Sequence, residues 1–251
     1  MTYIRSAARV SRILVRVATQ PSGATAREIA EALELPLPTA YHLLGTLVSE
    51  GLLAKDARRR YQLGPTLGTI ANAYVRQLTP PEFLVAPLHE LATTTGETAY
   101  LASWRDDRIA VLASVEGRNA VRVSGVHLGI ADDVHARASG KVLLAFAPET
   151  LRTAYLRAHP LVRVTKRTIV EPDQFQHELE RTRQRGFAID EEEFREGVAC
   201  AAVPVLDNAH VVATYAVSAP AERFRQSRDQ LVESLREAAQ AATIGVGRPA
   251  A

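Results

Sequence analysis

The chain has a single cysteine and no long uninterrupted run of apolar residues. Its single cysteine, Cys200, excludes an intramolecular disulfide framework and leaves too few thiolates for a structural zinc site of the usual kind. No uncharged apolar run reaches the roughly 18 residues that a membrane span needs, and arginines interrupt the first apolar residues. We therefore expect no signal peptide and no membrane contact, and a cytoplasmic protein whose 251 residues form one large or two modest domains.

The net charge is small but unevenly distributed. The whole chain carries a formal charge of +2, which is weak evidence for a nucleic-acid partner. Residues 1–64 hold nine basic and five acidic side chains, a balance of +4, so the remainder lies near −2. Positive charge is thus concentrated at the N-terminal end, where a contact with an anionic partner is favoured.

The first 64 residues predict three helices followed by a β-hairpin. Apolar residues recur at helical spacing over 6–19, and a Pro-Ser-Gly sequence ends that run. Thr25 and Glu28 form the capping-box pattern at the start of a second helix. A third helix opens at Pro38 and ends at Gly51, a residue type that commonly terminates helices. The hairpin that follows has a basic tip and consists of the extended runs Leu52–Lys55 and Arg60–Leu63.

This order of elements is that of a winged helix-turn-helix, in which the third helix enters the major groove of DNA. One face of the helix carries small, hydrogen-bonding and aromatic side chains that packing does not use. The residues expected to face base edges are Thr39, Tyr41, His42 and Thr46. The residues expected to contact phosphates are Arg27, Arg58, Arg59 and Arg60. Taken singly, each feature also fits an ordinary solvated face or turn.

The rest of the chain predicts an α+β domain behind a linker helix. A helical stretch runs from Pro65 to Leu78 and is closed by Pro80 and Pro81. Strands and helices then alternate, with a turn at Asp106–Asp107 and a further strand near Ala120–Ser124, which favours a largely antiparallel sheet. The expected divisions are a DNA-binding domain over 1–64, a linker helix over 65–80 and a third segment over 81–251.

With both halves laid out, the chain resembles the IclR family of bacterial transcription regulators. The blocks that carry the resemblance in the N-terminal half are Ile29–Pro36, Leu43–Leu47, Glu50–Leu53 and Tyr61–Pro65. Those in the C-terminal half are Gly96–Ala99, Ala138–Ala145, Arg185–Glu193, Gly197, Cys200 and Ala202–Pro204. The resemblance implies a winged helix-turn-helix, a linker helix used in dimerisation, and a GAF-like domain that binds a small organic effector, often a carboxylate or aromatic acid. It further implies a repressor that acts on a double-stranded DNA operator as a homodimer or homotetramer.

Some positions depart from the family pattern. Leu37 and Pro38 stand where many members have a basic residue and a serine, and His42 stands where an arginine is common, so the operator sequence cannot be carried over. In the C-terminal half, Ala216 replaces a serine that contacts the ligand in the family, and Ala219 replaces a glycine. The effector pocket therefore lacks one polar contact.

The effector site is expected at the start of an apolar helix. Ala138 and Ser139 begin that helix, and its first-turn amides, its dipole and the Ser139 hydroxyl can together hold a carboxylate. The resemblance adds Asp190, Cys200 and Ser218, a set suited to orienting a ligand rather than to catalysis. Cys200 also fits a buried apolar role, and Asp190 also fits a loop cap or an ion pair with a nearby arginine.

Enzyme motifs are absent or incomplete, so we expect neither an enzyme nor a cofactor. Gly140-Lys141 has the tail of a phosphate-binding loop, but Val142 follows where Ser or Thr should bind magnesium. His127 and His135, with Asp132 or Asp133, form a weaker candidate for a metal site, because loop histidines are more often surface or packing residues. Two other functions stay open: a metabolite sensor that does not bind DNA, and an enzyme built on the effector domain.

Overall fold

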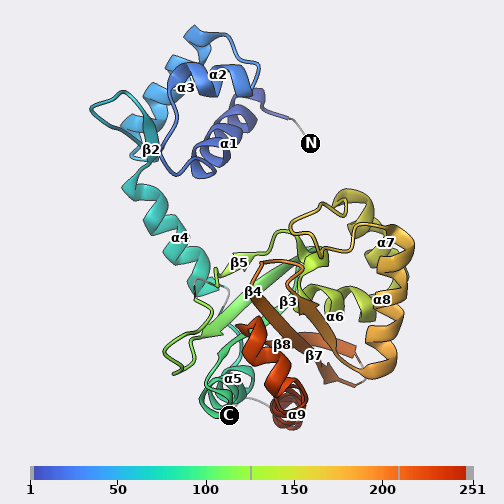
Figure 1. The fold of residues 1–251 in the computed structure, drawn as a ribbon. Coiled ribbons are helices and arrows are strands. Elements are labelled where there is room, and N and C mark those ends of the chain that lie inside the picture. Colours follow the sequence, from blue (N-terminus) through green and yellow to red (C-terminus); the bar gives the residue numbers. More distant parts are fainter. Residues whose placement is uncertain (1–2, 78, 125, 209, 247–251) are drawn as a thin grey trace. The chain divides into compact units, whose positions relative to one another are not determined.

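The computed structural model describes residues 3–77, 79–124, 126–208 and 210–246, and the chain forms two compact units, Met1–Gln77 and Leu78–Ala251 (Figure 1). The helix over 65–77 belongs to the first unit, whereas the sequence predicts it as a separate segment. The elements of the first unit are α1 (Arg5–Ala18), α2 (Ala26–Ala32), α3 (Leu37–Ser49), β1 (Leu53–Lys55), β2 (Tyr61–Leu63) and α4 (Pro65–Gln77).

The first unit has the predicted winged helix-turn-helix order. Thr25 and Glu28 make the predicted capping box, in which the Thr25 hydroxyl accepts from the Glu28 amide and the Glu28 carboxylate accepts from the Thr25 amide. The core between the helices contains Ile13, Ile29 and Leu44, each fully buried. The amide–carbonyl pair between Ala24 and Tyr61 attaches the hairpin to the segment before α2.

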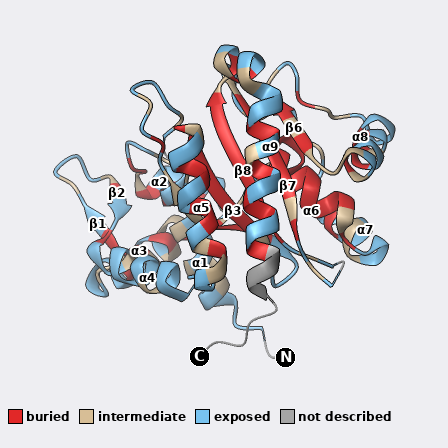
Figure 2. Ribbon diagram, turned by 90° about the horizontal axis from the view of Figure 1, so that it is seen from below, coloured by how far each residue is buried: buried red, intermediate tan, exposed pale blue. Residues whose placement is uncertain are grey.

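Helix α4 has no buried residue, although its sequence carries an apolar stripe. Ile70 is 53% exposed, Tyr74 40% and Val75 37%. In Figure 2 the helix lacks the colour of buried residues. Within the described part of the chain, no neighbouring element covers this stripe.

The second unit is built on one six-stranded sheet with the strand order β5-β4-β3-β8-β7-β6, and every neighbouring pair is antiparallel. This confirms the predicted α+β class. Asp106 and Asp107, at the predicted turn between β3 and β4, both adopt the left-handed φ values that suit a tight hairpin. The strands are β3 (Thr98–Arg105), β4 (Arg108–Val115), β5 (Gly129–Ile130), β6 (Ala188–Glu191), β7 (Val198–Asp207) and β8 (His210–Pro220).

Helices cover both faces of the sheet (Figure 1). On one face, Leu88 and Leu235 from two helices pack with Tyr215 of β8. On the other face, Leu144 and Leu179 pack against Ala102 and Ile109. The helices on the first face are α5 (Glu82–Thr95) and α9 (Ala221–Val246). Those on the second are η1 (Val134–Ala136), α6 (Ala138–Phe146), α7 (Glu149–Ala158) and α8 (Pro172–Arg185).

The predicted strand over Ala120–Ser124 is wrong. Side chains, rather than a strand ladder, hold this segment: the Thr98 hydroxyl donates to the carbonyl of Val123, and Arg223 donates to the carbonyl of Val121. The short strand β5 takes the sheet edge instead, where it pairs with β4. The segment before β5 is therefore an irregular loop along the sheet. Across the described residues, no helix combines the length and apolar character needed to span a bilayer.

Candidate functional site

Helix α3 presents the predicted polar face to solvent. Tyr41 is 53% exposed, His42 and Thr46 are exposed, and Thr39 is half-buried at the start of the helix. The Thr46 hydroxyl donates to the carbonyl of His42, so its proton is used within the helix and its oxygen remains an acceptor. The opposite face supplies the unit's core. Helix α3 is therefore fixed by one face and exposed on the other.

The hairpin tip is shaped by Asp56, whose Oδ1 accepts the amides of Arg58 and Arg60 at 2.9 and 2.8 Å. Arg59 takes a left-handed φ of 62° in the turn, and the side chains of Arg58 and Arg59 are exposed. Arg27 is also exposed, at the start of α2. Arg27, Arg58 and Arg59 are thus accessible, and their phosphate contacts stay a prediction.

Arg60 is engaged within its own unit. Its Nε donates to the carbonyl of Ser22 at 2.9 Å, and its Nη2 donates to the carbonyl of Gly23 at 2.6 Å. Nη2 also lies 3.3 Å from a carboxylate oxygen of Glu28. The side chain thus ties the hairpin to the turn before α2, a role that the sequence does not indicate.

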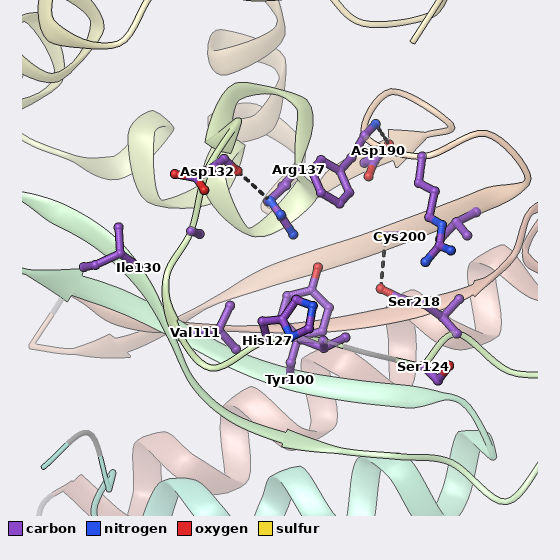
Figure 3. A pocket seen from close by; sticks show the side chains of 16 residues that line it. Tyr100, Val111, Ser124, His127, Ile130, Asp132, Arg137, Asp190, Cys200 and Ser218 are labelled. Atoms are coloured by element: carbon purple, nitrogen blue, oxygen red, sulfur yellow. Dashed lines mark hydrogen bonds between the residues drawn. The ribbon is translucent and has the colours of Figure 1, made fainter. Parts of the chain in front are cut away.

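A cavity of about 430 Å³ opens in the second unit, at the face of the sheet (Figure 3). It is large enough for a small organic ligand. Of the five residues predicted for the effector site, Asp190, Cys200 and Ser218 line it. They lie side by side because Asp190 pairs with Cys200 in the β6–β7 register and Cys200 pairs with Ser218 in the β7–β8 register.

The cavity floor carries polar groups that stay uncharged at neutral pH. The Sγ of Cys200 and the Oγ of Ser218 form a hydrogen bond of 2.9 Å, and both residues are buried. Burial raises the pKa of the Cys200 thiol, and burial likewise raises the pKa of the Tyr100 hydroxyl beside it. Both groups stay protonated at neutral pH, so Cys200 is a poor nucleophile and serves as a neutral hydrogen-bonding wall.

Asp190 connects the cavity to a buried charge cluster. Its Oδ1 accepts the amides of Glu193 and Phe194 at 2.7 and 3.2 Å, so Asp190 caps the turn after β6, one of the alternatives that the sequence left open. Behind it, Lys141 is fully buried, and its Nζ lies 2.5 Å from the Oε1 of Glu193 and 2.9 Å from the carbonyl of Ile189. Burial raises the pKa of Asp190 to about 7, although the charge of Lys141 opposes the rise.

The free energy of unfolding of the second unit should fall as the pH rises from about 4 to about 7, and then level off. The unfolded chain loses the Asp190 proton near the ordinary pKa of 3.8, whereas the folded protein keeps it to about 7. Each pH unit in that window costs up to about 1.4 kcal/mol per proton. Trp104 is the single tryptophan, so urea unfolding followed by its fluorescence measures this unit. The variant Asp190→Asn should flatten the slope; an identical slope would assign the dependence to other groups.

Ala138 and Ser139 do not line the cavity. Both are buried in the first turn of α6, and Arg137, one residue earlier, lines the cavity instead. A sequence signal for this arrangement exists: Arg137 occupies the N-cap of α6, a position that usually favours Ser, Thr, Asp or Asn, and it makes no side-chain cap. The sequence prediction did not include Arg137, whose side chain lies at the cavity where Ala138 and Ser139 were expected.

The two histidines considered for a metal site have different surroundings. His127 is exposed and lines the cavity with Asp132, whereas the Nε2 of His135 lies 2.9 Å from the carbonyl of Val162. No cluster of three or more metal-ligating side chains occurs among the described residues. The geometry therefore supports packing and lining roles for these histidines.

Known proteins match both units of the chain. The HTH-type transcriptional regulator BhcR of Paracoccus denitrificans is 32% identical over 241 residues, which cover 93% of this chain and 86% of the relative. The HTH-type transcriptional repressor AllR of Salmonella typhi is 28% identical over 203 residues, covering 80% and 74%. An IclR homolog from Microbacterium hydrocarbonoxydans, solved as a complex with 4-hydroxybenzoate, has a TM-score of 0.69 at 25% identity and covers 95% of this chain and 98% of its own.

Family models agree with these relatives. The model of the IclR helix-turn-helix domain matches residues 6–57, which include α3, and the model of the C-terminal domain of bacterial IclR regulators matches residues 74–244, which include the cavity. The matched segments thus contain the exposed helix face and most of the second unit. The chain belongs to the IclR family of bacterial transcriptional regulators.

Proposed function

We propose that the protein is a cytoplasmic repressor that binds an operator through its first unit and is controlled by a small organic acid in its second. The observation that carries the proposal is the cavity of about 430 Å³ in a unit distinct from the one that exposes α3. A ligand there can shift DNA affinity only if it binds differently to two states of the regulator, so the coupling is reciprocal. The IclR homolog solved with 4-hydroxybenzoate supports an aromatic carboxylate as the effector.

The DNA interface is proposed to use two classes of contact. Thr39, Tyr41, His42 and Thr46 face base edges in the major groove. Arg27, Arg58 and Arg59 contact phosphates and fix the position of α3. Arg60 contributes indirectly, because its bonds to the turn before α2 hold the hairpin in place.

The operator is proposed to be occupied by a homodimer or homotetramer. The apolar stripe of α4, with Ile70, Tyr74 and Val75 exposed, fits pairing with a second copy of the chain. An isolated helix of this length is marginally stable in water, and a partner surface would stabilise it. Two copies would then present two α3 helices to the half-sites of a palindromic operator.

Replacing Arg59 by Gln should weaken DNA binding and lower the magnitude of the salt slope by about one unit, because one phosphate contact is lost. Binding to duplexes from upstream of the protein's own gene, measured at a series of salt concentrations, gives the slope. Arg157→Gln, an exposed arginine of α7 in the second unit, is the matched control and should leave the slope unchanged. Equal slopes for Arg59→Gln and the unmodified protein would remove Arg59 from the interface.

A metabolite sensor without specific DNA binding is the second candidate. The observation that favours it is the start of α3, where Leu37 and Pro38 place apolar groups in the first turn. Gel shifts with a pool of random duplexes, followed by enrichment, separate the two functions. Enrichment of a common motif supports the repressor, whereas effector binding without any enriched motif supports the sensor.

A further inference from the structure

Arg137 points into the effector cavity and is held there at two places (Figure 3). Its Nε donates to the backbone carbonyl of Asp132 at 2.9 Å. Its Cζ lies 3.5 Å from the centre of the Phe194 ring, a cation–π contact. The guanidinium is thus anchored through one nitrogen and one face, which leaves the donors on Nη1 and Nη2 for another acceptor.

The guanidinium of Arg137 has no carboxylate partner among the described residues. No described carboxylate lies within ion-pair distance of its guanidinium, and Asp132 contacts it through the backbone carbonyl rather than the carboxylate. A half-buried cation without a counter-ion attracts an anion strongly, because water screens it only in part. The planar fork of a guanidinium matches the two oxygens of a carboxylate.

The other charged residues that line the cavity limit which kind of anion Arg137 can bind. Asp132 and Asp190 line the same cavity as Arg137, and Arg195 lies exposed at its wall. The Asp132 carboxylate, near this one anchored cation, disfavours a dianion such as a phosphate monoester more strongly than a monoanion, whereas buried Asp190 keeps its proton to about pH 7 and contributes less. The hydroxyl and thiol groups of Tyr100, Ser218 and Cys200 then remain for the uncharged part of the ligand.

We propose that Arg137 is the anion-binding residue of the effector cavity and that it selects a monoanionic carboxylate. This inference rests on the proposed control by a small organic acid. In it, Arg137 rather than Ser139 binds the carboxylate of the ligand. Ser139 is 2% exposed and does not line the cavity, whereas Arg137 does. Arg137 is accordingly a specificity-determining residue.

The test is calorimetric titration of the full-length protein with acids and matched neutral amides. The probes are 4-hydroxybenzoate, benzoate and lactate, each compared with its primary amide, together with phenyl phosphate. At least one acid should bind at least about tenfold more tightly than its amide, as expected for a charge-assisted bidentate pair. Arg137→Gln should abolish that preference, Arg137→Lys should keep part of it, and phenyl phosphate should bind more weakly than the best acid.

The controls separate this inference from the proposed function. Melting temperatures verify that each variant is folded, and Ser139→Ala tests the site predicted from the sequence. If an acid binds Arg137→Gln as tightly as the unmodified protein, the effector function stands and the role of Arg137 is overturned. The same holds if Ser139→Ala alone removes the acid preference. If no acid binds at millimolar concentration, or the amides bind as well as the acids, the carboxylate effector and the role of Arg137 both fall.

Discussion

Replacing Lys141 by Met should lower the free energy of unfolding of the second unit by about 3–5 kcal/mol, because it leaves a buried carboxylate without its cation. Lys141 is fully buried, and its Nζ contacts Glu193 and the carbonyl of Ile189. Methionine fills a similar volume, so the loss reports the ion pair rather than a cavity. Urea unfolding followed by Trp104 fluorescence, at pH 7.5, measures the change.

Two controls make the Lys141 result specific. Lys141→Met combined with Glu193→Leu removes both charges and should recover most of the lost stability. At pH 5.5 the single variant should also lose less free energy of unfolding than at pH 7.5. Burial raises the pKa of Glu193, so its carboxylate is protonated more readily at the lower pH. The stabilising role of the Lys141–Glu193 pair is contradicted if the single variant is as stable as the unmodified protein. It is also contradicted if the double variant is as unstable as the single variant.

Gly140→Ala should destabilise the second unit by about 3 kcal/mol, at the upper end for overpacked cores. A Cβ on Gly140 would lie 2.0 Å from the carbonyl oxygen of Val134 and 2.3 Å from a methyl carbon of the same residue. Backbone cannot rotate aside as a side chain does, so α6 would have to move away from η1. Because Arg137 lies between these two helices, binding of the proposed effector should weaken as well.

Gly68→Ala in α4 is the matched control for Gly140→Ala. A Cβ there has no atom within 4 Å, and alanine is the better helix former by up to about 1 kcal/mol. Thermal unfolding followed by circular dichroism should therefore show opposite shifts for the two alanine variants. Equal shifts would mean that the contact between α6 and η1 adapts without cost.

Local patterns in the sequence predict most of the fold. The capping box at Thr25 and the turn at Asp106–Asp107 involve residues close in sequence, and both occur as predicted. The strand predicted over Ala120–Ser124 fails because its carbonyls bond to Thr98 and Arg223, which are distant in sequence. Short-range periodicity cannot reveal such partners.

The candidate site is less predictable for the same reason. Resemblance to the family identifies Asp190, Cys200 and Ser218, and the strand register brings them together in the cavity. The role proposed for Arg137 depends on Asp132 and Phe194, and only the folded chain shows that these three residues meet. The engagement of Arg60 with the carbonyls of Ser22 and Gly23 is likewise visible only once the hairpin is folded.

The central pairing of the sheet joins strands that are far apart along the chain. Thr98 of β3 pairs with Ser218 of β8, so closing the sheet requires almost the whole second unit. Pairings of such long sequence separation form slowly, and domains fold from the N-terminus as the ribosome releases them. The first unit can therefore fold on a nascent chain before strand β8, and with it the part of the cavity wall that Ser218 supplies, has been synthesised.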